Sequence, residues 1–348
     1  MQKRSSLLKK IGLALGVFVL LLVVIYFELV VYGLRQGWGQ AKILWNAKPV
    51  EEFIADPLYP DSLKAKLHLI GEIRKFAIDS LGMKDTEVYK KMYDQQGKPI
   101  MWVVQACEPF ALESVKWKFP LIGAVPYKGF FREDLALALR DELKEQGKDV
   151  MVRNPGGWST LGWFNDPILS NMLKRSEGDL ASLIIHEMVH TTIFIKDSID
   201  FNENLANFIG DKAAGEFIKY KFGADSRQYH EYMYEDDDYT LFAEHMLRGT
   251  KVLDSLYATM TEQESLEEKK LRKEATITRI VLALDTLSLR LLEKPSERFS
   301  KRLPNNAYFM SFVQYEAKQN FFEEECEGRF KGDLKKYLAY LKKKYGAL

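Results

Sequence analysis

Hydrophobic residues form one nearly uninterrupted stretch near the start of the chain. From Ile11 to about Tyr32 almost every position is apolar, with Glu28 as the exception, and four basic residues lie among the ten positions before it. As a helix this stretch is roughly 33 Å long, enough to cross a bilayer. No small-residue cleavage pattern follows it. We therefore expect residues 1–33 to form an uncleaved membrane anchor, with a cytoplasmic N-terminus and residues 34–348 on the opposite side.

Beyond this segment, short strand-like runs alternate with helix-like ones. The apolar residues of Asp61–Leu81 recur every three to four positions, which is typical of an amphipathic helix. Two runs within 87–108 flank the turn signal Gln96–Pro99, and we interpret them as a hairpin. The remaining elements predicted in this part are strands at 121–128 and 149–153 and a helix at 133–147.

From Glu177 onward the pattern is almost wholly helical. Leu180–Ile195 is dense in aliphatic residues, so this helix is expected to be buried on most sides. Three later segments also have a helical period, namely 238–292, 305–322 and 331–345. We predict an α+β fold for 34–348, with a small mixed β-sheet within about 87–165 and a predominantly helical part over about 177–348.

Composition excludes several classes of protein. The 348 residues include 50 basic and 49 acidic ones, and this balance does not favour nucleic acid as a partner. There are two cysteines, Cys107 and Cys326, which excludes a disulfide-dense fold and an all-cysteine metal site. In an oxidising compartment the two would be able to pair.

The most informative motif is His186-Glu187-Met188-Val189-His190, which has the form H-E-x-x-H. On a helix, positions i and i+4 share a face, so both imidazoles can bind one Zn²⁺. Glu187 lies beside them, where it can act as a general base. The alternative is a hydrogen-bonded pair of core histidines beside a solvated glutamate. Because these polar residues are costly inside an apolar helix unless they have partners, we favour the metal site.

A third ligand is predicted just beyond the motif. A catalytic zinc site usually has three protein ligands and one open position. After a turn at Lys196–Asp200 a second helix is expected, and Glu203 near its start lies almost level with His190 across the resulting helical hairpin. We therefore predict Glu203 as the third ligand. The alternative is a capping box with Asp200 as N-cap and Glu203 at N3, which excludes a ligand role for the same carboxylate.

These motifs resemble those of the gluzincins, the thermolysin-like zinc peptidases. The sequence is most similar to a bacterial family usually called putative zinc aminopeptidases, although the gap from His190 to Glu203 is shorter than in thermolysin-like enzymes and Asn207 replaces an aspartate found there. The similar segments are Gly39-Gln40, Lys48–Val50, Ile73–Ala77, Ser159–Pro167, Asn171–Leu173, Ile185–His190, Asn202–Gly210 and Pro304–Ala307 with Tyr315.

The resemblance implies a gluzincin-like catalytic body that holds one Zn²⁺ and hydrolyses peptide bonds, with an aminopeptidase as the specific expectation. Tyr315 is our candidate for stabilising the oxyanion, since a tyrosine often does so in gluzincins. A core tyrosine on an amphipathic helix is the alternative. Asn207, one turn after Glu203, is expected to accept the proton on the free nitrogen of a ligand histidine.

The peptide substrate is expected to pair with an extended segment ahead of the motif. The segment proposed for this comprises Thr160, Leu161, Gly162, Trp163 and Phe164. Its glycine would allow close approach of the substrate backbone. The alternative is an aromatic loop packed on the core.

The sequence thus predicts a zinc peptidase anchored in the bacterial cytoplasmic membrane, with its catalytic domain periplasmic or otherwise outside the cytoplasm. Two alternatives remain open: an endopeptidase with the same mechanism, and a non-catalytic membrane-tethered protein with a vestigial metal site. Glu187 favours an enzyme, because a purely structural site would not need it.

Overall fold

The computed structural model describes residues 2–119, 123–155, 165–196 and 198–346, and it divides the chain into two units, Met1–Asn46 and Ala47–Leu348. The first unit consists of helices α1 (Gln2–Ile25) and α2 (Phe27–Asn46). In the described part of the chain, no single helix is both long and apolar enough to cross a bilayer. The part of α1 from Lys10 to Ile25 and helix α2 together have sufficient length and apolar character, but the two helices meet at an angle of 88°. The break lies at Tyr26, inside the predicted span. Neither Tyr26 nor its two neighbours is a glycine or proline, so the sequence does not indicate a bend there.

One small sheet of the second unit has three strands and precedes the helical part in the chain. Its central strand β3 (Trp102–Cys107) is antiparallel to both β6 (Tyr127–Phe130) and β7 (Asp149–Arg153). The strand predicted at 149–153 is confirmed, and the helix predicted at 133–147 is α5 (Glu133–Glu145). The strand predicted at 121–128 is replaced, over its described residues, by β5 (Gly123–Val125), which pairs with β4 (Trp117–Phe119), and by the start of β6.

The predicted hairpin over 87–108 is wrong. β2 (Lys91–Tyr93) pairs with β1 (Lys48–Pro49) and, in parallel, with β8 (Ile168–Leu169), and does not pair with β3. The turn signal itself is real, since Gln96 and Gly97 both have positive φ. Its two ends, however, are tied to different neighbours: the backbone N–H of Gln95 donates to Ser170 Oγ at 2.8 Å, and Asn154 Nδ2 donates to the Met101 carbonyl at 2.7 Å. The single mixed sheet is therefore replaced by separate small sheets.

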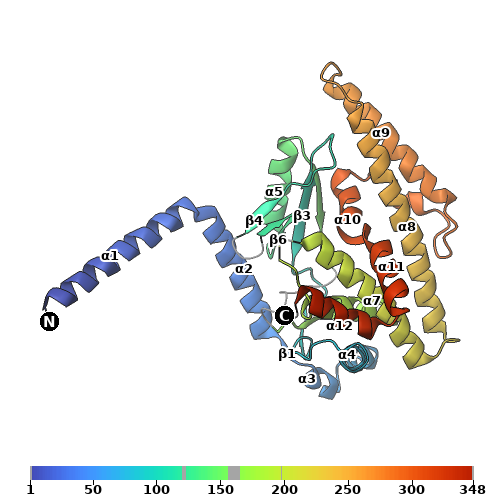
Figure 1. Ribbon diagram of the computed structural model, residues 1–348, viewed down its shortest axis with the longest axis horizontal. Helices are drawn as coiled ribbons and strands as arrows, with labels where there is room; N and C mark the ends of the chain where they lie inside the picture. Colours follow the sequence, from blue (N-terminus) through green and yellow to red (C-terminus); the bar gives the residue numbers. More distant parts are fainter. Residues whose placement is uncertain (1, 120–122, 156–164, 197, 347–348) are drawn as a thin grey trace. The chain divides into compact units, whose positions relative to one another are not determined.

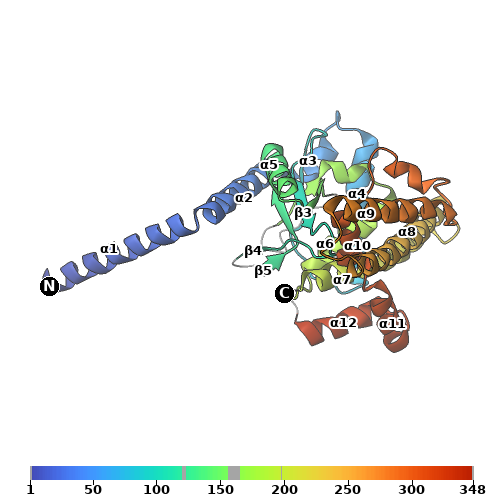
Figure 2. The same ribbon diagram turned by 90° about the horizontal axis from the view of Figure 1, so that it is seen from above.

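Along the chain, the remaining helices come before and after these strands. α3 (Val50–Ala55) and α4 (Asp61–Asp79) precede β2, and α4 confirms the amphipathic helix predicted at 61–81. The helical part comprises α6 (Glu177–His190), α7 (Ile199–Phe222), α8 (Arg227–Ala258), α9 (Leu266–Leu282), α10 (Asn306–Glu316), α11 (Gln319–Phe330) and α12 (Leu334–Tyr345), with 3₁₀ turns at Ser170–Lys174, Ala283–Thr286 and Pro295–Phe299. In Figures 1 and 2, α8 and α9 lie side by side, as do α11 and α12.

Two of the predicted helices are interrupted at positions where polar side chains bind backbone N–H groups. The segment predicted as helical over 238–292 is interrupted after Ala258, and α9 restarts with a capping box formed by Ser265 and Glu268. The segment over 305–322 is split between α10 and α11, where the backbone N–H of Lys318 donates to Asn204 Oδ1 at 2.7 Å. In both places a polar side chain accepts from a backbone N–H group. The hydrophobic periodicity of the sequence does not reveal such bonds.

The largest hydrophobic core surrounds α6. Ser176 caps its N-terminus by accepting from the backbone N–H of Asp179 at 3.1 Å. Leu180, Ile184 and Ile185 are fully buried, which confirms that the helix is covered on most sides. The helix ends at His190 rather than near Ile195. Beyond it, the hydroxyls of Thr191 and Thr192 both donate to the Met188 carbonyl. A second core joins α8, α9 and α10.

Helix α10 is fixed by its first residues, the Pro304–Ala307 segment. Asn305 caps the helix, and its Nδ2 donates to the Val150 carbonyl of β7 at 3.0 Å. Asn306 is fully buried: its Nδ2 donates to the Glu108 carbonyl at 2.8 Å, and its Oδ1 accepts from the Tyr257 hydroxyl at 2.7 Å. These bonds fix α10 between the β3 sheet and the outer helices.

Replacement of Asn306 by alanine should be strongly destabilising. Asn306→Ala leaves buried backbone and phenol groups without partners, so we expect the free energy of unfolding to fall by about 2–4 kcal/mol. Chemical denaturation measures this. Asn320→Ala, at an exposed position of α11, is the matched control and should change stability little. Equal effects of the two variants would contradict the role assigned to Asn306.

Candidate metal centre

Helices α6 and α7 form a closely packed hairpin. Gly210 of α7 permits this approach: a Cβ there would lie 3.0 Å from the Ser182 carbonyl oxygen and 3.3 Å from His186 Cβ. Asn202 of α7 closes the hairpin by binding Ile195 of the connecting loop: it accepts from the Ile195 backbone N–H at 2.9 Å and donates to the Ile195 carbonyl at 2.7 Å. The side chains of α6 that face α7 are therefore held opposite the first turns of α7.

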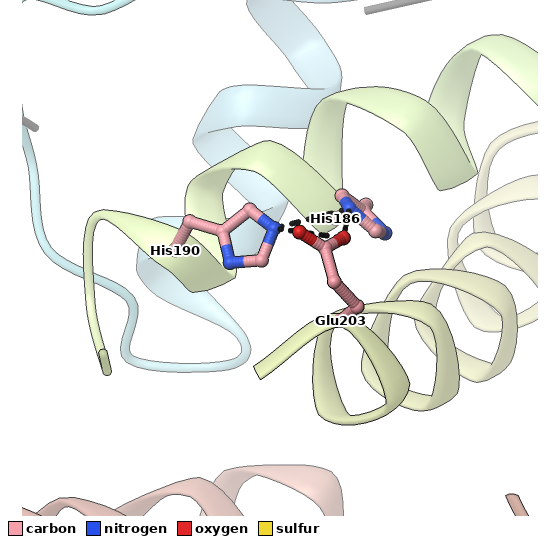
Figure 3. A group of neighbouring side chains, drawn as sticks. All are labelled: His186, His190 and Glu203. Atoms are coloured by element: carbon pink, nitrogen blue, oxygen red, sulfur yellow. Dashed lines mark hydrogen bonds and ion pairs between the residues drawn. The ribbon is translucent and has the colours of Figure 1, made fainter. Parts of the chain in front are cut away.

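His186, His190 and Glu203 meet across this hairpin. Figure 3 shows both imidazoles of α6 directed toward the Glu203 carboxylate of α7. Glu203 Oε2 lies 3.5 Å from His186 Nε2 and 3.6 Å from His190 Nε2, and the two imidazole nitrogens are 3.2 Å apart. Among the described residues these three side chains form a group able to hold a metal ion.

The spacing of these three atoms suits a zinc ion. Bonds of about 2.0–2.1 Å to tetrahedral zinc place ligand atoms roughly 3.3 Å from one another. The separations of 3.2, 3.5 and 3.6 Å are close to this value. Two imidazoles and one carboxylate are also a common ligand set of catalytic zinc sites. The residues present therefore fit the ion that the sequence predicts.

The alternative role of Glu203 in a capping box is wrong. α7 begins at Ile199 with Ser198 as its N-cap, so Asp200 lies within the first turn and does not cap the helix. The Glu203 carboxylate is instead directed at the histidines, as shown in Figure 3.

Charge is concentrated in this buried group. Burial opposes protonation of His186, but the carboxylates of Glu203 and Glu187 outweigh it and raise the pKa of His186 to about 9. Burial likewise disfavours the carboxylate of Glu203, but the two imidazoles hold the pKa of Glu203 well below its usual range. Without a metal, the group is a buried ion pair. A divalent cation would take the place of the proton on the imidazole.

Glu187 is 8% exposed, so it is not the solvated glutamate of the alternative reading. The Glu187 carboxylate helps to raise the pKa of His186; burial and the hydrogen bond to Glu203 are the larger influences on that pKa. Glu187 also helps to raise the pKa of Tyr89, for which burial is the larger cause. Glu187 thus lies close to His186, as the H-E-x-x-H motif requires of a general base.

Tyr315 is close to the same group. Its hydroxyl accepts from Arg153 Nη2 at 3.0 Å. Burial raises the pKa of Tyr315, with Glu203 as the next cause, and the pKa of Tyr127 is raised by the same two causes in the same order. Sequence reasoning missed both Arg153 and Tyr127. The one signal for Arg153 was a charged residue at the end of an apolar strand.

The chain matches a family model described as "Putative aminopeptidase" over residues 31–345. The chain belongs to this family. No curated protein and no solved structure matches it. The family description supports a peptidase, and the matched range includes His186, Glu187, His190 and Glu203.

In this family member, three asparagines of α7 support the position of Glu203. Asn202 closes the loop, and Asn204 Nδ2 donates to the Gln314 carbonyl at 2.6 Å. Asn207 Nδ2 donates to Glu316 Oε1 at 3.0 Å and to the Tyr315 carbonyl at 3.2 Å. The bonds of Asn204 and Asn207 join the first turns of α7 to the end of α10.

Asn207 is predicted to accept from the free nitrogen of a ligand histidine, and it does not do so for His190. The Nδ1 atom of that imidazole is buried and has no hydrogen-bond partner in the described structure. Asn207 Nδ2 donates instead to two acceptors at the end of α10. The predicted substrate segment Thr160–Phe164 lies outside the described residues. The two cysteines are buried and free, so no disulfide joins them.

A further carboxyl group, Asp211, lies close enough to His186 to affect its pKa. Ser182 Oγ donates to Asp211 Oδ1 at 2.5 Å. Burial raises the pKa of Asp211 from 3.8 to about 7, and the nearby carboxylates of Asp236 and Glu316 act in the same direction. Ionisation of Asp211 is therefore unfavourable in the folded protein up to about pH 7.

This cost makes the effect of Asp211→Asn on stability depend on pH. The raised pKa means that folding is penalised progressively between about pH 4 and 7 and fully above pH 7, whereas below about pH 3 the group is neutral in both states. Asparagine can still accept from Ser182. We expect metal-free Asp211→Asn to be more stable than the native protein by roughly 2–4 kcal/mol at pH 8 and nearly equal to it at about pH 3.

Thermal unfolding in a chelator at the two pH values measures this difference. Asp225→Asn, at an exposed position after α7, is the control and should have no effect at either pH. A stabilisation of Asp211→Asn that is the same at both pH values would show that ionisation of Asp211 is not its cause.

Proposed function

We propose that this protein is a membrane-anchored zinc peptidase, with aminopeptidase activity as its specific function. The observation that carries the proposal is the spacing of the three donor atoms of His186, His190 and Glu203, 3.2–3.6 Å apart and held by two packed helices. The family description supports the peptidase activity. Buried Glu187 beside the donors favours catalysis over a structural metal site.

The side chains of the centre have separate tasks in this proposal. His186, His190 and Glu203 would hold the zinc ion. When bound, the ion would acidify a water molecule and polarise the scissile carbonyl. Glu187 accepts the proton of the attacking water and passes it to the leaving amine.

Tyr315 is suited to stabilising the oxyanion. Arginine carries only hydrogen-bond donors, so Arg153 must donate to the Tyr315 oxygen, and the single phenol proton is left for another acceptor. The positive guanidinium also strengthens the phenol as a donor. We propose that Tyr315 donates this proton in a hydrogen bond to the oxygen that becomes negative in the transition state.

Zinc content and hydrolysis should respond differently to two substitutions. Glu187→Gln removes the base but leaves the ligands, so we expect one zinc per chain and a loss of peptide hydrolysis of roughly a hundred-fold or more. Glu203→Ala removes a ligand, so we expect loss of zinc together with activity. Metal analysis and a peptide assay on the full chain measure both.

Full zinc content with no hydrolysis by the native protein of any peptide in a diverse library would favour the vestigial-site alternative. Comparison of free with N-acetylated peptides separates aminopeptidase from endopeptidase action, because only an aminopeptidase needs the free amine.

Membrane anchoring is supported by the apolar positions of α1 and α2. In α2, Phe27, Leu34, Trp38 and Trp45 recur at intervals of 7, 4 and 7 residues, so they lie along one face, and all four are exposed. The two indole rings contact each other edge to face at 5.9 Å. Tryptophan favours the boundary between lipid and water. We propose that α1 enters the bilayer and that this face of α2 lies at its extracytoplasmic surface.

Charged residues in α1 should release the protein. Leu15→Arg with Leu20→Arg adds roughly 2.5–3.5 kcal/mol of insertion cost for each substitution. We expect the double variant to move from the carbonate-resistant membrane fraction to the soluble one. Leu58→Arg, at an exposed position of the second unit, should leave the distribution unchanged. Retention of both variants in the membrane would contradict anchoring by α1.

A further inference from the structure

An open cleft of about 810 Å³ is lined by several residues that are neighbours in the chain of those at the candidate metal centre. Gln314 and Pro126 line it, and each is followed directly by a tyrosine whose pKa is affected by Glu203. Asp200, one turn before Glu203, also lines it. Ligand-binding clefts of proteins have volumes of about 300–1,000 Å³, so this one has room for a short peptide.

The lining of the cleft is mixed in character. Its apolar and charged members include Leu112, Ile199, Met310, Lys116, Lys318 and Glu113. A chain of apolar and polar groups, such as a peptide, matches this lining better than a purely apolar ligand does.

One polar group in this lining lacks a partner. Gln314 is 4% exposed, and its Nε2 has no hydrogen bond in the described structure. The rest of the residue is well held: its carbonyl accepts from Asn204, and its Oε1 accepts from Gln105 Nε2 at 3.2 Å. A buried amide nitrogen without an acceptor costs free energy that a ligand carbonyl can return.

The orientation of this amide follows from Arg153. Arginine can only donate, so the atom of Gln105 that faces Arg153 Nε at 3.2 Å must be the amide oxygen. The nitrogen of Gln105 must then donate to the oxygen of Gln314. The nitrogen of Gln314, with two N–H groups, is consequently the atom left over. The same guanidinium leaves the Tyr315 proton free, so neighbouring residues of α10 both offer donors.

We propose that the cleft binds the part of an extended peptide that leads away from the metal centre, and that Gln314 Nε2 donates to a main-chain carbonyl of that peptide. Gln314 is thus a substrate-binding residue, and Arg153 and Gln105 are positioning residues that keep its amide in the donating orientation. The inference rests on the proposed peptidase function, and it adds that the substrates are peptides longer than two residues.

Binding to the Glu187→Gln protein tests this without cleavage. Dissociation constants are measured by calorimetry on the full chain, for peptides of two to five residues that share one N-terminal sequence. We expect affinity to increase with length. Gln314→Leu, which keeps the size but removes the donor, should reduce the affinity ratio of pentapeptide to dipeptide roughly five-fold.

A second variant tests the orientation while Gln314 is kept. Gln105→Glu can only accept, so it turns the Gln314 amide and presents an oxygen to the peptide carbonyl. The same ratio should fall by a similar factor. Gln263→Leu, at an exposed position between α8 and α9, is the matched control and should leave the ratio unchanged.

Affinity that does not depend on length, or a ratio that neither Gln314→Leu nor Gln105→Glu changes while both variants keep their zinc content and melting temperature, would overturn the proposal. Hydrolysis by the native chain is measured separately. Length-dependent binding without hydrolysis would sink the peptidase function but leave the peptide-binding cleft, whereas hydrolysis without length dependence would do the reverse.

Discussion

The ion pair between Glu203 and the two imidazoles is the interaction on which the site depends. Buried charges are tolerated only when they are paired, and here each helix supplies one sign. The Glu203 carboxylate also favours a proton on His186, whose pKa it helps to raise. The pairing holds the three donor atoms 3.2–3.6 Å apart, and a divalent cation bound there would take the place of that proton.

The surrounding residues explain how two helices keep this geometry. Gly210 allows α6 and α7 to approach, and Asn202 closes the loop between them. Asn204 then joins α7 to the end of α10. Because α10 is itself fixed on β7 by Asn305, the metal centre, Tyr315 and Gln314 share one set of supports. A geometry fixed in this way favours catalysis, since misplaced catalytic groups lose much of their effect.

Much of this centre could be predicted from the sequence, because its information is local. His186 and His190 share a helix face by their spacing, and Glu203 follows within one hairpin. The partners of Tyr315 could not be predicted, because Arg153 is far away in the chain and reaches it through the pairing of β7 with β3. The same reason accounts for the hairpin at 87–108: its turn is local, but the parallel pairing of β2 with β8 is not. Asn207 had the expected position, but its amide found acceptors on α10.

X-ray absorption at the zinc edge of the purified full chain tests the central claim most directly. The account predicts one zinc per chain, with two imidazole nitrogens and one or two oxygens at about 2.0–2.1 Å, and loss of one oxygen ligand or of the metal in Glu203→Ala. A spectrum with sulfur ligands, or one that is identical in the native chain and in Glu203→Ala, would contradict it.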